Sequence, residues 1–137
     1  MTTEHVFFVG KLIRDKVCEI DRALGISPCE HIMEMDEYLE RLKEKLIEEA
    51  TEVIEASSAE ELIVELADLT EVIHAIAATK NFTPQDIENA RLIKKMEKGG
   101  FEGRVFNSHT FVKADHPEIS YFRTSPHKYP EIKQPKK

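Results

Sequence analysis

The sequence has only two cysteines, Cys18 and Cys29, in 137 residues. Two cysteines are too few for the disulfide framework of a small secreted protein, and neither lies in the spacing of a zinc or redox motif. We therefore expect both side chains to be reduced, buried thiols.

The sequence also lacks a long hydrophobic run and an excess of positive charge. The first residues, MTTEHVFFVGK, hold an apolar run of only four residues after an acid, a pattern of neither a signal peptide nor a spanning helix. The formal net charge of −7 disfavours binding to nucleic acid phosphates or anionic membranes. We expect a cytoplasmic, soluble protein without a nucleic acid or membrane partner.

The residues that are present fit one compact domain. At 137 residues, with 41% hydrophobic residues and no internal repeat, the chain can bury one modest core. The last stretch, SPHKYPEIKQPKK, carries three prolines and terminal lysines, which predict irregular structure. We expect a domain over residues 1–112 and an irregular tail over 113–137.

Hydrophobic periodicity and the usual start and stop residues predict four helices. They cover residues 12–24, ended by Gly25, then 36–56, 62–78 and 83–98, the last closed by Gly99 and Gly100. Asp36 is the predicted cap of the second helix. Residues 6–9 are β-branched and aromatic, so they could pair with the stretch 104–115. The fold class is therefore all-α, an antiparallel helical bundle with room for a small β element.

The second and third helices are separated by a very tight turn. Ser58 stands three residues before Glu61, which is the spacing of a capping box. A connection this short makes consecutive helices antiparallel neighbours. The third helix, LIVELADLTEVIHAIAA, is apolar nearly all round, the composition of a helix covered by others, including those of a second subunit.

A carboxylate stands in the apolar stripe of the second helix. Alternating steps of three and four from Leu39 through Leu42 and Leu46 reach Glu49 before Val53. Glutamates at helical spacing usually form a solvated face. The position of Glu49 instead indicates a carboxylate that points inward.

Two acidic pairs of the same spacing lie on these neighbouring helices. Glu49 and Glu52 share one face of the second helix, and Glu65 and Asp68 share one face of the third. Across a tight antiparallel turn the four carboxylates can converge. Their mutual repulsion would disfavour this arrangement unless a cation were bound, and Mg²⁺ and Mn²⁺ prefer oxygen ligands. The pattern predicts a divalent metal site, with Glu48 at its border.

The acidic pairs and two flanking segments together resemble a known family. The pattern is ExxE at residues 49–52, a gap of residues 53–64, and ExxD at residues 65–68. KLIRDKV at residues 11–17 resembles KLVRDKIPEII, the start of a subgroup described as house-cleaning nucleotide pyrophosphatases, and KGGFEGRVF at residues 98–106 resembles RGGFEKRIF, the ending of that subgroup. Over roughly residues 10–106 the chain is therefore similar to the MazG-like all-α nucleoside triphosphate pyrophosphohydrolases, which include phosphoribosyl-ATP pyrophosphohydrolases and dimeric dUTPases.

The resemblance implies Mg²⁺-dependent hydrolysis, with Mn²⁺ as a substitute, of a canonical or noncanonical nucleoside triphosphate to the monophosphate and pyrophosphate. It also implies a homodimer or homotetramer. The implied metal ligands are Glu49, Glu52, Glu65 and Asp68. Glu48 is the candidate that orients or deprotonates the attacking water. The candidate cations for the substrate phosphates are Lys11, Arg14, Lys98 and Arg104.

Two alternatives remain open. A phosphoribosyl-ATP pyrophosphohydrolase uses the same acidic motifs on a different substrate, although the KLIRDKV start argues against it. A non-catalytic helical interaction module could use the acids as a structural or regulatory metal site. The sequence does not specify which base the site recognises, because base selectivity depends on pocket shape.

Overall fold

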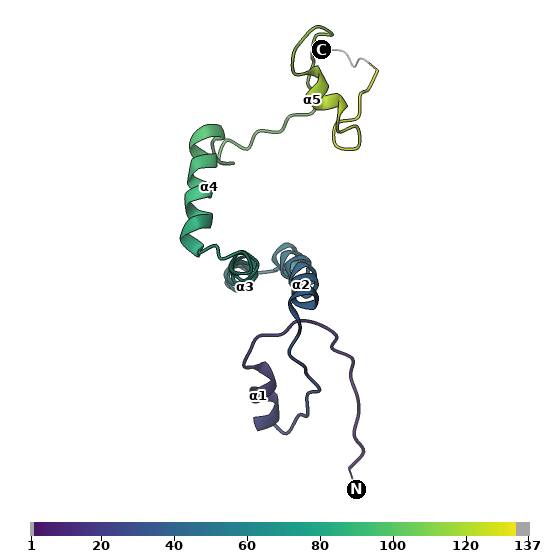
Figure 1. Ribbon diagram of the computed structural model, residues 1–137, viewed down its shortest axis with the longest axis vertical. Helices are drawn as coiled ribbons and strands as arrows, with labels where there is room; N and C mark the ends of the chain where they lie inside the picture. Colours follow the sequence, from purple (N-terminus) through teal and green to yellow (C-terminus); the bar gives the residue numbers. More distant parts are fainter. Residues whose placement is uncertain (1, 134–137) are drawn as a thin grey trace. The chain divides into compact units, whose positions relative to one another are not determined.

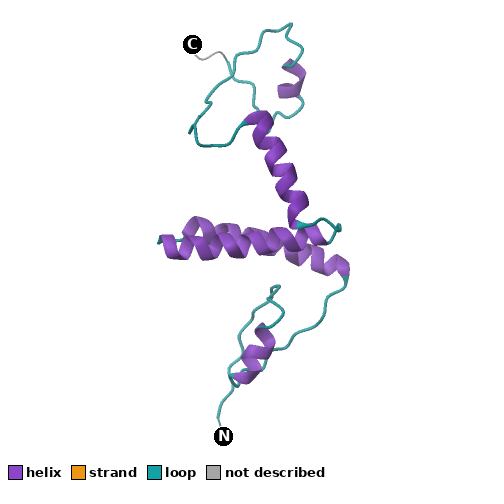
Figure 2. Cartoon of the chain, turned by 90° about the vertical axis from the view of Figure 1, so that its left-hand side faces the viewer, coloured by secondary structure: helices purple, strands orange, loops and turns teal. Residues whose placement is uncertain are grey.

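The computed structural model describes residues 2–133, and all regular secondary structure in this range is helical (Figure 2). The helices are α1 (Val17–Ala23), α2 (Met35–Glu55), α3 (Ala59–Ala78), α4 (Pro84–Lys98) and α5 (Ile119–Arg123). The predicted all-α fold class is confirmed. None of the described helices is both long and apolar enough to cross a bilayer.

The core of the unit Met1–Lys98 lies between α2 and α3. These two helices run side by side and pack against each other (Figure 1). Leu42 on α2 is only 1% exposed, and Val72 on α3 is 7% exposed. The apolar stripe predicted for the second helix therefore forms the contact with the third.

The tight turn between α2 and α3 is held by side chains of its own residues. Ser58 Oγ accepts a hydrogen bond from the Glu61 backbone N–H at 3.1 Å, as a helix cap does. The Glu61 carboxylate turns back to the Ser57 N–H and Oγ, each at 2.9 Å, rather than to the Ser58 N–H. The predicted N-cap at Ser58 is confirmed. The Glu61 carboxylate bonds Ser57, the residue before the cap.

A reciprocal cap also begins α4. The Asp86 carboxylate accepts the Thr83 N–H at 2.7 Å, and Thr83 Oγ1 accepts the Asp86 N–H at 3.1 Å. At the other end of the helix Gly99 has φ +82°, a backbone conformation that favours glycine. The predicted limits of this helix are confirmed to within a residue.

Three local predictions were wrong. The first helix begins at Val17 and not at residue 12, because residues 11–16 extend toward α2 and α3 instead. The second helix begins after Glu34, so Asp36 lies in its first turn and does not cap it. Cys18 is buried as expected, but Cys29 is exposed.

The optional β element is absent from residues 2–133. Val6 and Phe8 are 95% and 96% exposed, and Val105 and Phe106 are each 90% exposed. A run of β-branched and aromatic residues becomes a strand only where a second strand pairs with its backbone. Neither stretch has such a partner in the described part of the chain.

The chain divides into two units, Met1–Lys98 and Gly99–Lys137. In the second unit Tyr121, Phe122 and Tyr129 form a cluster of rings with centroids 5.3–5.7 Å apart. Arg123 pairs with Glu131 at 3.1 Å beside it. The domain limits at residues 112 and 113 stay a prediction, and residues 134–137 of the predicted tail lie outside the described residues.

Candidate metal and phosphate site

Glu49 is a buried carboxylate in the contact between α2 and α3. The residue is only 7% exposed, while its neighbour Ile47 on the same helix is 69% exposed. A carboxylate this buried needs a compensating charge or hydrogen bond, because its hydration has been removed. The surroundings of Glu49 therefore decide what this site can bind.

Three of the four predicted metal ligands meet at this point. Glu49, Glu65 and Asp68 each offer a carboxylate oxygen, and these oxygens lie within 4.8 Å of one another. Glu52 is exposed and stands outside this group of three, but it interacts electrostatically with Glu65. A donor set made only of carboxylate oxygens fits a hard divalent ion such as Mg²⁺ or Mn²⁺. We call Glu49, Glu52, Glu65 and Asp68 the carboxylate cluster.

The carboxylate cluster repels itself electrostatically. Burial raises the pKa of Glu65, and so do the charge of Glu52, a hydrogen bond with Glu52, and the charges of Asp68 and Glu49. A raised carboxyl pKa means that the folded state disfavours the ionised form. A bound cation would remove this penalty, which is the electrostatic reason that the cluster fits a metal.

Glu65→Gln is expected to stabilise the metal-free protein near neutral pH. Because the pKa of Glu65 is raised by folding, wild-type stability falls as pH rises from the ordinary value of 4.5 through the raised pKa, and it stays lower above that pKa. The variant lacks this loss. Thermal unfolding in EDTA, followed by circular dichroism from about pH 4 to about pH 8, should show a melting temperature that exceeds the wild-type value only at the higher pH.

Added Mg²⁺ should raise the melting temperature of the wild type more than that of Glu65→Gln, because the variant lacks one carboxylate of the cluster. The matched control is Glu60→Gln, an exposed residue in the first turn of the same helix. A pH-independent difference between Glu65→Gln and wild type would contradict the assigned repulsion.

Two cations from the segment before α1 contact the site. Lys11 Nζ lies 2.8 Å from Glu48 Oε1, and an Arg14 guanidinium nitrogen lies 2.7 Å from Asp68 Oδ1. The Lys11 hydrogen bond is the largest cause that lowers the pKa of Glu48, and Lys45 lowers it further. Glu48 is therefore held in its ionised form at the border of the carboxylate cluster.

Lys45 also contacts the site, although its sequence position did not identify it as a site residue. Its Nζ lies 3.1 Å from Glu49 Oε1 and 3.3 Å from Glu48 Oε2. The sequence signal was the spacing, since Lys45 stands four residues before Glu49 and three before Glu48 on one helix. That spacing is so common on solvated helix faces that it does not identify a site residue without knowledge of burial.

The other two predicted phosphate cations are not in this group of contacts. Lys98 is the last residue of α4, and Arg104 belongs to the second unit, where its φ is +53°. The assignment of these two side chains to substrate phosphates stays a prediction.

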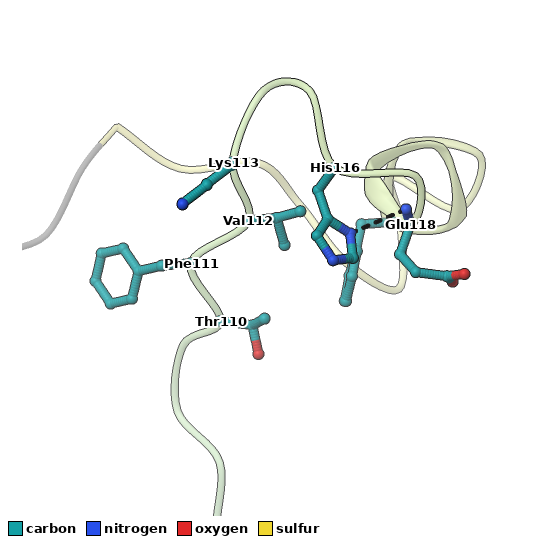
Figure 3. Close-up of a pocket in the computed structure, with 7 residues that line it drawn as sticks. Thr110, Phe111, Val112, Lys113, His116 and Glu118 are labelled. Carbon is teal, nitrogen blue, oxygen red and sulfur yellow. Dashed lines mark hydrogen bonds between the residues drawn. The ribbon is translucent and has the colours of Figure 1, made fainter.

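The second unit contains a pocket of about 450 Å³ (Figure 3). His116 Nδ1 accepts the backbone N–H of Glu118 at 3.1 Å within it. The lining residues are Thr110, Phe111, Val112, Lys113, His116, Glu118 and Phe122. Glu118 is the one carboxylate among them, so this pocket does not offer the converging oxygens that a hard divalent ion requires.

Comparison with known proteins agrees with the chemistry of the carboxylate cluster. The sequence pattern of the phosphoribosyl-ATP pyrophosphohydrolase family matches residues 17–94, which is more than half of the chain and includes all four carboxylates. Comparison with curated proteins and with solved structures gives no match. The chain is therefore a nucleotide pyrophosphohydrolase that belongs to the phosphoribosyl-ATP pyrophosphohydrolase family, within the MazG-like all-α nucleoside triphosphate pyrophosphohydrolase superfamily.

Proposed function

We propose that this pyrophosphohydrolase cleaves a canonical or noncanonical nucleoside triphosphate to the monophosphate and pyrophosphate, and that it requires Mg²⁺, with Mn²⁺ as a substitute. The observation that carries the proposal is the convergence of Glu49, Glu65 and Asp68, whose ligand oxygens lie within 4.8 Å of one another. Three converging carboxylates repel a triphosphate unless cations stand between them. When the same carboxylates hold divalent cations, those cations can neutralise the charge of the triphosphate.

The reaction joins a water oxygen to the α-phosphorus and breaks the bond from that phosphorus to the oxygen of the β-phosphate, so that pyrophosphate leaves. A divalent ion held by Glu49, Glu52, Glu65 and Asp68 would neutralise phosphate charge and lower the pKa of a bound water. Glu48 is ionised and lies beside these carboxylates, so it can accept a hydrogen bond from the attacking water. Because its pKa is lowered, Glu48 is better suited to orient the water than to remove its proton.

Lys11 and Arg14 are the proposed phosphate-binding cations. Lys11 contacts Glu48 at the border of the carboxylate cluster, and Arg14 contacts Asp68 within it. Both are about half exposed, at 49% and 59%, and can exchange a carboxylate partner for a phosphate oxygen. Lys98 and Arg104 remain further candidates from the sequence.

A second candidate substrate is phosphoribosyl-ATP. The family match over residues 17–94 favours it specifically, while the segment at residues 11–17, which resembles the house-cleaning enzymes, lies almost entirely outside the matched range. Both substrates present the same triphosphate, so the carboxylate cluster supports either. A non-catalytic module is disfavoured by the family membership.

Turnover on a substrate panel tests the proposal. The wild-type protein should release pyrophosphate from at least one of the canonical, damaged or phosphoribosyl-linked triphosphates when Mg²⁺ or Mn²⁺ is present, and EDTA should reduce the release to background. The nucleotide product should be the monophosphate, identified by ion-exchange chromatography. Release that persists in EDTA would contradict the metal requirement, and release of orthophosphate instead of pyrophosphate would contradict the site of cleavage.

We also propose that the active form is a homodimer or homotetramer. Leu62, Leu66 and Ile73 share one side of α3 and are 39%, 41% and 38% exposed. Their spacing of four and seven residues makes them a continuous apolar stripe, which we call the α3 stripe. A second copy of the chain is the proposed cover for this stripe.

A further inference from the structure

Lys45 has a different environment from the surface lysines of α2. Its side chain is 17% exposed, whereas Lys43, two residues earlier, is 68% exposed and pairs with Glu40. Exposed pairs of the Lys43 kind are screened by solvent and hold their geometry weakly. A lysine withdrawn from water beside two carboxylates interacts with them more strongly and has fewer alternative positions.

The ammonium group of Lys45 joins two carboxylates with different proposed roles. It lies 3.1 Å from Glu49 Oε1 in the carboxylate cluster and 3.3 Å from Glu48 Oε2 at its border. The other oxygen of Glu48 is taken by Lys11 at 2.8 Å. Both oxygens of Glu48 therefore have a cationic partner, one from its own helix and one from the segment before α1.

We propose that Lys45 is a positioning residue, which sets the distance and orientation between the proposed water-orienting Glu48 and the proposed metal ligand Glu49. This inference rests on the proposed function, since it assigns a task within the same site. Lys45 does not touch the substrate in this role. It acts through the two carboxylates, because one ammonium group that forms ion pairs with both of them restricts their relative placement.

Lys45→Met separates this role from a structural one, because the substitution has two effects of opposite sign. Methionine keeps an unbranched apolar stem like that of lysine but removes a positive charge next to the carboxylates, so Mn²⁺ should bind about tenfold more tightly. Glu48 and Glu49 lose their common partner, so kcat should fall about 10-fold to 100-fold, as expected for misplaced reacting groups. KM should change little. Misfolding would instead weaken Mn²⁺ binding and lower kcat together.

Electron paramagnetic resonance of free Mn²⁺ gives the affinity, and pyrophosphate release gives kcat and KM. Lys45→Arg should recover part of kcat, since it restores a cation that can bond both carboxylates. Lys43→Met is the matched control and should leave both measurements unchanged. If Lys45→Met fails to fold, Lys45→Gln is the second variant with the same expected signs.

Weaker Mn²⁺ binding in folded Lys45→Met, or a kcat within about twofold of wild type, would overturn the proposal. Failure of the proposed function gives a different result, because wild-type protein would then bind Mn²⁺ and release no pyrophosphate. The Mn²⁺ affinity still tests Lys45 in that case. An affinity of Lys45→Met equal to that of wild type would show that Lys45 does not act on the carboxylates.

Discussion

Glu49→Gln is expected to lower kcat/KM for metal-dependent pyrophosphate release by at least about 100-fold, which corresponds to about 2.7 kcal/mol of transition-state stabilisation. Glutamine has nearly the same shape as glutamate, so the packing at this 7% exposed position is retained. The negative charge is lost, and a neutral amide is a weaker ligand for a hard divalent ion. The ion then holds the phosphate charge less firmly in the transition state.

Stability and activity should separate in this variant. The charge of Glu49 is among those that raise the pKa of Glu65, so its removal relieves repulsion in the metal-free protein, and Lys45 keeps Glu48 as its partner. We therefore expect Glu49→Gln to be folded, with a melting temperature in EDTA no lower than that of wild type, while its turnover is strongly reduced. Calorimetry with Mn²⁺ would report the expected loss of metal affinity independently of turnover.

Glu44→Gln is the matched control for Glu49→Gln. It makes the same chemical change on the same helix, at a side chain that is 60% exposed and pairs with Arg41. We expect its kcat/KM to equal that of wild type. Asp68→Asn should behave like Glu49→Gln, since both carboxylates offer an oxygen to the same group of three. Metal-dependent turnover that survives either site substitution would reject the assignment of the carboxylate cluster.

The helical scaffold could be predicted because its signals are local. The stripe through Leu39, Leu42 and Leu46 and the serines of the tight turn depend on residues within a few positions of one another. These signals predicted α2, α3 and their antiparallel contact, and they indicated that Glu49 interrupts the apolar stripe of α2. The meeting of Glu49 with Glu65 and Asp68 then follows from the same hairpin geometry.

Features that depend on distant residues could not be predicted in the same way. Residues 12–16 were predicted as the start of a helix, yet Lys11 and Arg14 bond to carboxylates 37 and 54 positions away, which no local pattern encodes. Lys45 has the spacing of an ordinary surface pair, and only its 17% exposure distinguishes it. The four-residue run at 6–9 has the composition of a strand but no strand to pair with in the described part of the chain.

Ile73→Lys is expected to separate the proposed oligomer into single chains. Ile73 lies in the α3 stripe and is 38% exposed, so the protomer alone has room for the longer lysine side chain. In a subunit interface the same lysine would bury an unpaired charge against apolar side chains, which costs several kcal/mol. Sedimentation equilibrium should give a multiple of 15.8 kDa for wild type and 15.8 kDa for the variant.

Ile54→Lys is the matched control, because it places the same charge at an isoleucine that is 83% exposed on α2, outside the α3 stripe. The control should keep the wild-type mass. A wild-type protein that sediments as a single chain would remove the need for a partner, and dissociation by Ile54→Lys alone would place the interface on α2 instead.

Metal binding should survive the separation caused by Ile73→Lys. Glu49, Glu65 and Asp68 all come from one hairpin of one chain, and none of them belongs to the α3 stripe. The Mn²⁺ affinity of the monomeric variant should therefore stay within about threefold of the wild-type value, a change of about 0.7 kcal/mol or less. A much larger loss would mean that the second copy supports the carboxylate cluster, and that one hairpin does not hold these oxygens together without it.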